Sequence, residues 1–196
     1  MKRMLSILLM LMLVPYAALA EEEDEPVTPM YELTMAHGFR FGGALSYMQL
    51  WDTNYLNLLK THCNSITATN EMKAYSLLDQ SKSRASSDGM PRMNFSAADK
   101  MVAWAQENGL GVRGHVLVWD AYMTPWFFHE QYDVGKPLVS REVMLQRLES
   151  YITQVITHFE EKFPGVVYCW DVVNEAVGEG NEFDANDARH LRTTRG

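Results

Sequence analysis

The sequence predicts an α/β fold of parallel strands and helices, a (β/α)8 TIM barrel of which it holds about the first four β/α units. Four short, β-branched apolar segments alternate with segments of helical periodicity, and strands joined through helical crossovers pair in parallel. A doubly wound sheet fits this alternation too. The barrel is favoured because no glycine-rich phosphate loop follows the first strand and polar residues follow several strands, where barrel enzymes place their active sites.

The amino-terminal part supplies two predicted helices and two strands. Residues 31–36 follow two prolines and are predicted as a short helix, and residues 39–44 as a strand that ends in tight backbone. Asp52 or Thr53 caps the next helix, because both side chains accept hydrogen bonds from a helix start. Residues 64–69 are the second predicted strand.

The middle of the chain is predicted as loop, helix and strand. Residues 79–94 are rich in Ser, Lys, Asp, Gly and Pro, which indicates a loop. Ser96 opens a helix with Asp99 as a variant of the capping box, and Gly109 suits the position just past its end. Residues 111–119 form the third predicted strand.

The last predicted unit begins with a long aromatic loop, residues 120–137, a length that in a compact domain is typical of functional loops. Ser140 caps a long helix, whose apolar residues recur at three- and four-residue spacing until Pro164 stops it. Residues 166–175 follow as a fourth, buried strand that ends in Asn174 and Glu175.

The first twenty residues differ from the rest. Lys2 and Arg3 precede an apolar run, and small residues follow at the positions that a signal peptidase reads. A membrane anchor is the alternative, but the run is shorter than the ~20 residues of a membrane span. We therefore expect a signal peptide at 1–20, an acidic disordered segment at 21–28, a barrel domain at 29–196, and secretion to the periplasm or the medium.

The composition of the chain argues against several classes of binding partner. A formal net charge of −8 argues against nucleic acid and, after signal cleavage, against membrane surfaces. Cys63 and Cys169 are predicted as two separate thiols, although an exported protein could also pair them. The Cys and His spacing matches no metal site, and no cofactor is predicted.

Polar and aromatic residues gather at the ends of the predicted strands. Amide, lysine and histidine side chains hydrogen-bond hydroxyl groups, a tryptophan ring can lie against the apolar face of a sugar, and a glutamic acid can protonate a leaving oxygen. The pattern favours a polysaccharide over an anion or a lipid. Taken alone, His115 also fits a core histidine, and Glu175 a strand end that exits to solvent. The residues are Asn70, Lys73, His115, Trp119, Asn174 and Glu175.

Three motifs in order resemble glycoside hydrolase family 10, whose members are mostly endo-β-1,4-xylanases. They are residues 64–67 with 70–73, residues 112–119 with 125–126, and residues 170–175. The resemblance implies a barrel that hydrolyses xylan or xylo-oligosaccharides with retention. By position, Glu175 resembles the general acid/base and Asn174 the residue that holds the sugar 2-hydroxyl. The residues that resemble glycone-side contacts are Asn70, Lys73, His115 and Trp119.

The sequence also departs from the family. Ala68-Thr69 stands where Pro-Glu is usual, Ala74 replaces an expected Trp, and Asp120 follows Trp119 in place of His. Asp171 lies about 13 Å along a strand from Glu175 at ~3.3 Å per residue, too far for the nucleophile.

A barrel needs roughly 250 residues, so this chain of 196 residues is expected to be an amino-terminal half. We expect the nucleophile beyond it, an exposed apolar inner wall, and no activity from this part alone. Two alternatives stay open: a non-catalytic half-barrel that binds xylan weakly, and a related barrel glycosidase that acts on β-glucan.

Overall fold

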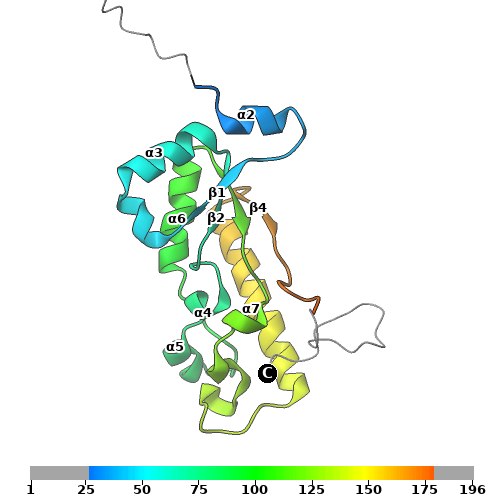
Figure 1. Ribbon diagram of the computed structural model, residues 1–196. Helices are drawn as coiled ribbons and strands as arrows, with labels where there is room; N and C mark the ends of the chain where they lie inside the picture. Colours follow the sequence, from blue (N-terminus) through cyan, green and yellow to red (C-terminus); the bar gives the residue numbers. More distant parts are fainter. Residues whose placement is uncertain (1–26, 179–196) are drawn as a thin grey trace, which may run out of the picture.

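The computed structural model describes residues 27–178, which form a four-stranded parallel sheet in the order β1-β2-β3-β4 (Figure 1). All three neighbouring pairs are parallel. The predicted parallel sheet is therefore confirmed, with strands shorter than the sequence suggested. The strands are β1 Gly42–Leu45, β2 Ser65–Ala68, β3 Gly111–Gly114 and β4 Val167–Trp170.

Helices connect the strands as predicted: α3 joins β1 to β2, α6 joins β2 to β3, and α7 joins β3 to β4. All three helices contribute side chains to the apolar core. The helices are α2 Met30–Met35, α3 Thr53–His62, α4 Ala74–Leu77, α5 Gln80–Arg84, α6 Ser96–Glu107 and α7 Arg141–Lys162. The 3-10 turns are η1 Tyr47–Trp51, η2 Asp120–Tyr122, η3 Pro125–Phe128 and η4 Glu130–Tyr132.

The two faces of the sheet differ because side chains alternate along each strand. In β2, Ile66 and Ala68 belong to the apolar core on the helix side. Ser65 and Thr67 face the other way, into a hollow of about 300 Å³. This open face carries glycine, alanine, serine, threonine, arginine and tyrosine, so the predicted apolar inner wall is wrong. Its lining residues are Arg40, Gly42, Gly43, Ala44, Ser65, Thr67, Arg113 and Tyr168.

Several helix ends follow the predicted local signals. The Asp52 carboxylate accepts a hydrogen bond from Tyr55 N at 3.1 Å, and Ser140 Oγ accepts one from Val143 N at 3.3 Å. Gly109 follows α6 with φ +72°, the left-handed conformation that glycine adopts without a steric cost.

The predicted capping box of α6 is wrong. Phe95 occupies the N-cap position without a side-chain cap. Asp99 instead accepts hydrogen bonds from His158 Nε2 at 2.6 Å and Lys162 Nζ at 2.7 Å, both on α7. The carboxylate therefore ties two helices together, because a charged partner on a neighbouring helix offers more than a local cap.

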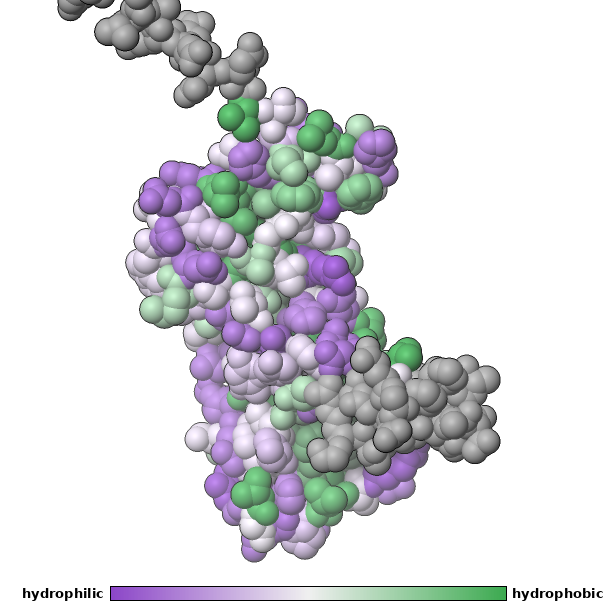
Figure 2. Space-filling model, viewed as in Figure 1, coloured by the Kyte–Doolittle hydropathy of each residue, from purple (hydrophilic) through white to green (hydrophobic). Residues whose placement is uncertain are grey.

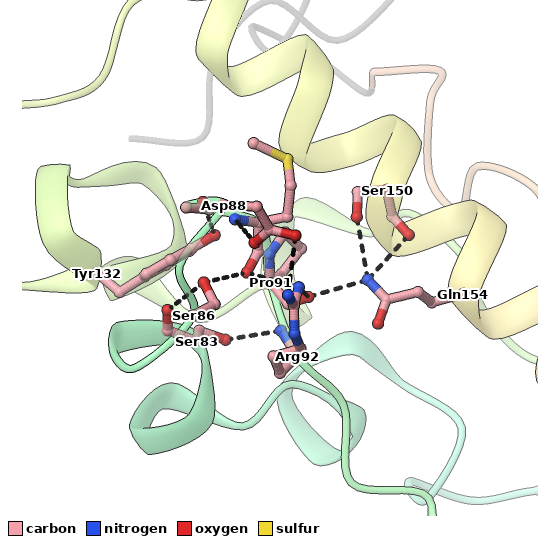
Figure 3. Close-up of polar contacts among 10 residues, drawn as sticks. Ser83, Ser86, Asp88, Pro91, Arg92, Tyr132, Ser150 and Gln154 are labelled. Atoms are coloured by element: carbon pink, nitrogen blue, oxygen red, sulfur yellow. Dashed lines mark hydrogen bonds and ion pairs between the residues drawn. The ribbon is translucent and has the colours of Figure 1, made fainter.

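Residues 79–94, predicted as a loop, contain the short helix α5 and are pinned to the rest of the chain (Figure 3). Tyr132 Oη donates a hydrogen bond to Gly89 O at 2.7 Å, and Gln154 Nε2 on α7 donates one to Pro91 O at 2.9 Å. The segment is thus a fixed part of the molecule.

Exposed apolar side chains gather around α2, seen as green atoms near the upper end of the molecule in Figure 2. Met30, Leu33 and Met35 are all more than 40% exposed there. No helix within residues 27–178 is long and apolar enough to cross a membrane. The predicted signal peptide (1–20) lies outside the described residues, as does all of the acidic segment (21–28) except Val27 and Thr28.

The two cysteines are separate thiols, as predicted. Cys63 is buried, whereas Cys169 on β4 is exposed. The expectation that residues 166–175 form a buried strand is therefore wrong. β4 pairs with β3 alone among the strands that the structure describes, so its other edge is open.

Candidate active site

The site forms where the chain leaves β3 and β4. After both strands end, backbone pairing resumes as a parallel bridge between Val118 and Val173, and Asn174 N donates a hydrogen bond to Val118 O at 2.9 Å. This pairing brings the two segments together just before Trp119 and Glu175. Two residues 56 positions apart in the sequence therefore become neighbours.

Glu175 lies at the exposed end of this pairing. Its Oε2 accepts a hydrogen bond from Trp119 Nε1 at 2.9 Å. Its backbone has φ +52°, an uncommon conformation for a residue other than glycine. Asn174, immediately before it, is half-buried and fixed through its backbone. The predicted acid/base position thus has Trp119 as a side-chain partner, just beyond the carboxyl ends of β3 and β4.

His115 is held by a carboxylate. Its Nδ1 hydrogen-bonds Asp171 Oδ2 at 2.8 Å, and its ring meets that of Trp119 edge-on at 5.7 Å. Because Nδ1 faces the carboxylate, a neutral His115 carries its proton there and leaves Nε2 as an acceptor. His115 is half-buried, so the alternative of a fully buried core histidine does not describe it.

Asp171 was not predicted as a site residue. Arg113 donates to it from Nε at 2.9 Å and from Nη2 at 2.7 Å. Burial on its own would raise the pKa of Asp171, but the hydrogen bonds from Arg113 and His115 outweigh it and hold the pKa below its usual value. In the sequence, its place inside the 170–175 motif is the signal that points to it.

Lys73 and Asn70 lie beside the Trp119 ring. Lys73 Nζ donates to Asn70 Oδ1 at 3.0 Å and sits 5.1 Å from the centre of the Trp119 ring. Lys73 is only 7% exposed. Burial lowers its pKa below the usual lysine value, and the charge of Glu71 partly opposes this shift. The structure therefore connects Asn70, Lys73, Trp119 and Glu175 in one cluster.

Glu71 has a different function. Its carboxylate accepts hydrogen bonds from Tyr47 N at 2.7 Å and Asn70 N at 3.0 Å. It therefore fixes the turn after β1 against the turn after β2, and so supports the position of Asn70.

The positions that depart from the family pattern lie in the same region. Thr69 is exposed, and Ala74 is 3% exposed within the core. Asp120 opens η2 and is exposed. Within residues 27–178, no group of three or more His, Cys, Asp or Glu side chains could hold a metal ion.

The sequence of this chain was compared with protein families and with individual proteins. The family model described as "Glycosyl hydrolase family 10" matches residues 30–194. A putative endo-1,4-beta-xylanase of Caldicellulosiruptor saccharolyticus is 52% identical over 106 residues, which cover 54% of this chain and 34% of that protein. Endo-1,4-beta-xylanase A of Thermotoga maritima is 39% identical over 157 residues, covering 80% of this chain and 14% of that protein. The chain thus spans about a third or less of these curated relatives.

Solved structures agree. The CBM22-1–GH10 modules of the N-terminal endo-1,4-beta-D-xylanase 10B of Clostridium thermocellum, complexed with xylohexaose, match with a TM-score of 0.70 and 34% identity, over 79% of this chain and 29% of that one. The endo-1,4-beta-xylanase of Caldicellulosiruptor owensensis matches with a TM-score of 0.64 and 30% identity, over 84% and 44%. The family's solved structures are (β/α)8 barrels, and four parallel strands of that fold are present here. The chain belongs to glycosyl hydrolase family 10.

Proposed function

We propose that this chain carries the acid/base half of an endo-β-1,4-xylanase active site, which hydrolyses internal bonds of xylan with retention. The observation that carries the proposal is the contact between Glu175 and Trp119, since the same Trp119 ring also meets His115 and Lys73. The names of the relatives and the xylohexaose in one solved neighbour support the choice of substrate.

In this mechanism Glu175 starts protonated and gives its proton to the leaving glycosidic oxygen, then acts as base toward water. Trp119 Nε1 holds one carboxyl oxygen in place. Asn174 is proposed to hold the sugar 2-hydroxyl, and the Lys73–Asn70 pair to hydrogen-bond hydroxyls on the glycone side. Asp171 orients His115 for the same purpose.

Retention also needs a nucleophilic carboxylate about 5–5.5 Å from the acid/base. Asp171 already accepts hydrogen bonds from Arg113 and His115, and Glu71 accepts them from two backbone N–H groups. Both carboxylates therefore serve to hold neighbouring groups in place. We therefore propose that the nucleophile comes from outside residues 27–178. We also propose export through a signal peptide at 1–20, so that the enzyme meets polymeric xylan outside the cytoplasm.

The test uses the longest gene product that contains this chain, with xylan as substrate. Replacing Glu175 by Gln should lower kcat on the order of 10²–10⁴-fold, because the leaving sugar loses its proton donor. With a dinitrophenyl xyloside, whose leaving group needs no proton, the initial burst of dinitrophenol should be nearly unaffected, whereas steady-state turnover should fall because the base toward water is lost. Glu149→Gln, at an exposed position of α7, is the matched control and should behave as wild type. A burst that slows as much as xylan hydrolysis does would contradict the role of Glu175 as the acid.

The same assay on the 196-residue chain tests the origin of the nucleophile. We expect no measurable release of reducing sugar from this chain alone. Release that Glu175→Gln abolishes would show that a local carboxylate serves as the nucleophile.

A further inference from the structure

Two tyrosines that belong to none of the predicted site residues continue the aromatic surface that begins at Trp119. The Tyr122 ring lies 4.3 Å from the Trp119 ring, and the Tyr75 ring lies 5.7 Å from that of Tyr122. The row comes from two segments, because Trp119 and Tyr122 follow β3 whereas Tyr75 lies on α4. It starts at Trp119, the partner of Glu175, and Tyr75 stands at its other end.

The Tyr122 ring also covers Lys73. Lys73 Nζ lies 4.1 Å from the centre of the Tyr122 ring, closer than the 5.1 Å to Trp119. An ammonium group over an aromatic face is held electrostatically, and Asn70 Oδ1 accepts one of its protons. Tyr122 therefore fixes the cation that the proposed function assigns to sugar hydroxyls.

Tyr75 is the open end of the row. It is 40% exposed, and exposed aromatic side chains with a polar edge are typical of binding surfaces. The preceding Ala74 is buried, so Tyr75 is the residue at the start of α4 that presents a ring toward Tyr122.

We propose that Tyr122 and Tyr75 extend the sugar-binding surface on the Lys73 side, with the Tyr75 ring stacking on a pyranose beyond the one next to Glu175. Tyr122 acts as the positioning residue for Lys73 and as the inner part of the same surface. The ligand is a neutral oligosaccharide of the class that the proposed function assigns, because its pyranose rings offer apolar faces to the tyrosines and hydroxyls to Lys73. This inference rests on the proposed function and extends it to substrate length.

The test measures affinity for xylobiose, xylotetraose and xylohexaose by calorimetry, in the longest gene product with Glu175→Gln to prevent turnover. Tyr75→Leu should weaken xylohexaose binding about tenfold, equal to about 1.4 kcal/mol, and leave xylobiose unchanged. Tyr122→Leu should weaken the binding of all three ligands, since Lys73 loses the aromatic ring that holds its ammonium group. Tyr75→Phe and Tyr122→Phe keep the rings and should bind within about twofold of the parent.

Phe39→Leu is the matched control, because Phe39 is 58% exposed and precedes β1, away from the strand ends. Equal losses for short and long ligands in Tyr75→Leu, or no loss at all, would overturn the inference while leaving the xylanase proposal intact. If the parent protein binds none of the three oligosaccharides, the proposed function fails and this inference fails with it.

Discussion

The two faces of the sheet come from the same four strands but carry different side chains, apolar on one face and largely polar on the other. On the helix-covered face, Leu45, Ile66 and Val112 are at most 1% exposed. On the open face, Arg113 is paired with Asp171, and Ser65 Oγ hydrogen-bonds Tyr168 Oη at 2.8 Å. One face buries apolar surface, and the other satisfies polar groups with one another.

This difference separates stability from chemistry. Burial of apolar side chains is the main favourable term in folding, and it is concentrated under α3, α6 and α7. The Arg113–Asp171–His115 chain runs from the open face to the ring of Trp119, so it links the open face of the sheet to the proposed site. Substitutions should therefore sort by the face on which they fall.

The largest expected effect comes from neighbouring residues of β2 on opposite faces. Ile66→Ala should lower the free energy of unfolding by about 2–5 kcal/mol, because it leaves a cavity in the core. Ile66→Val should cost about 0.5–1.5 kcal/mol. Thr67→Ala, on the open face, should stay within about 0.5 kcal/mol of wild type. Chemical denaturation measures all three, and a Thr67→Ala loss equal to that of Ile66→Ala would break the comparison.

The next largest effect is expected at Asp171. Asp171→Asn should cost about 1.5–2 kcal/mol at neutral pH, the lower part of the range for hydrogen bonds to charged groups, since its side chain is 22% exposed. Arg113→Lys is the matched variant: it keeps the charge but removes the two-pronged contact, and should cost less. A neutral result for Asp171→Asn would mean that the open-face pairing does not stabilise the fold.

The loss at Asp171 should also depend on pH. Its folded pKa lies below the usual value, so ionised Asp171 stabilises the fold fully above the ordinary aspartate pKa of about 3.9. That contribution disappears as the pH falls through the folded pKa. The difference in unfolding free energy between wild type and Asp171→Asn should therefore shrink below about pH 4. A difference that stays constant down to pH 2 would contradict this assignment.

How far the sequence could predict the structure depends on the range of the interaction. The starts of α3 and α7 follow from Asp52 and Ser140, which act on residues three positions away. The gathering of Lys73 and Trp119 follows because the carboxyl ends of parallel strands share one edge. These features need only local pattern and topology.

Features that depend on distant partners were missed. Asp99 was assigned to a local cap, but its partner His158 lies 59 positions away, and Asp171 likewise takes its function from Arg113, 58 positions away. The exposure of β4 depends on which strand lies beside it, which its own apolar composition does not reveal. The polar open face was missed for the same reason, since apolar patterning does not say which charges will pair.

The reactivity of the two thiols compares the open edge of the sheet, where Cys169 lies, with its covered side, where Cys63 lies. Burial raises the pKa of Cys63, so less of the reactive thiolate is present, and the side chain is only 8% exposed. Cys169 is exposed on β4. A thiol reagent at pH 8 should therefore label Cys169 at least about tenfold faster than Cys63. Cys169→Ser should remove the fast phase, and equal rates would show that the core next to α3 opens freely.

The smallest expected effect tests whether the polar groups of the open face act on one another. Tyr168→Phe removes the hydroxyl that pairs with Ser65 but keeps the ring under Arg40, whose guanidinium lies 4.4 Å from the ring centre. Each of Tyr168→Phe and Ser65→Ala should cost about 0.5–1.5 kcal/mol, the usual net contribution of one neutral hydrogen bond. Because both remove the same bond, the double variant should lose about as much as either single one, which corresponds to a coupling equal to the single loss, about 0.5–1.5 kcal/mol. Strictly additive losses would mean that the two hydroxyls lie side by side without stabilising each other.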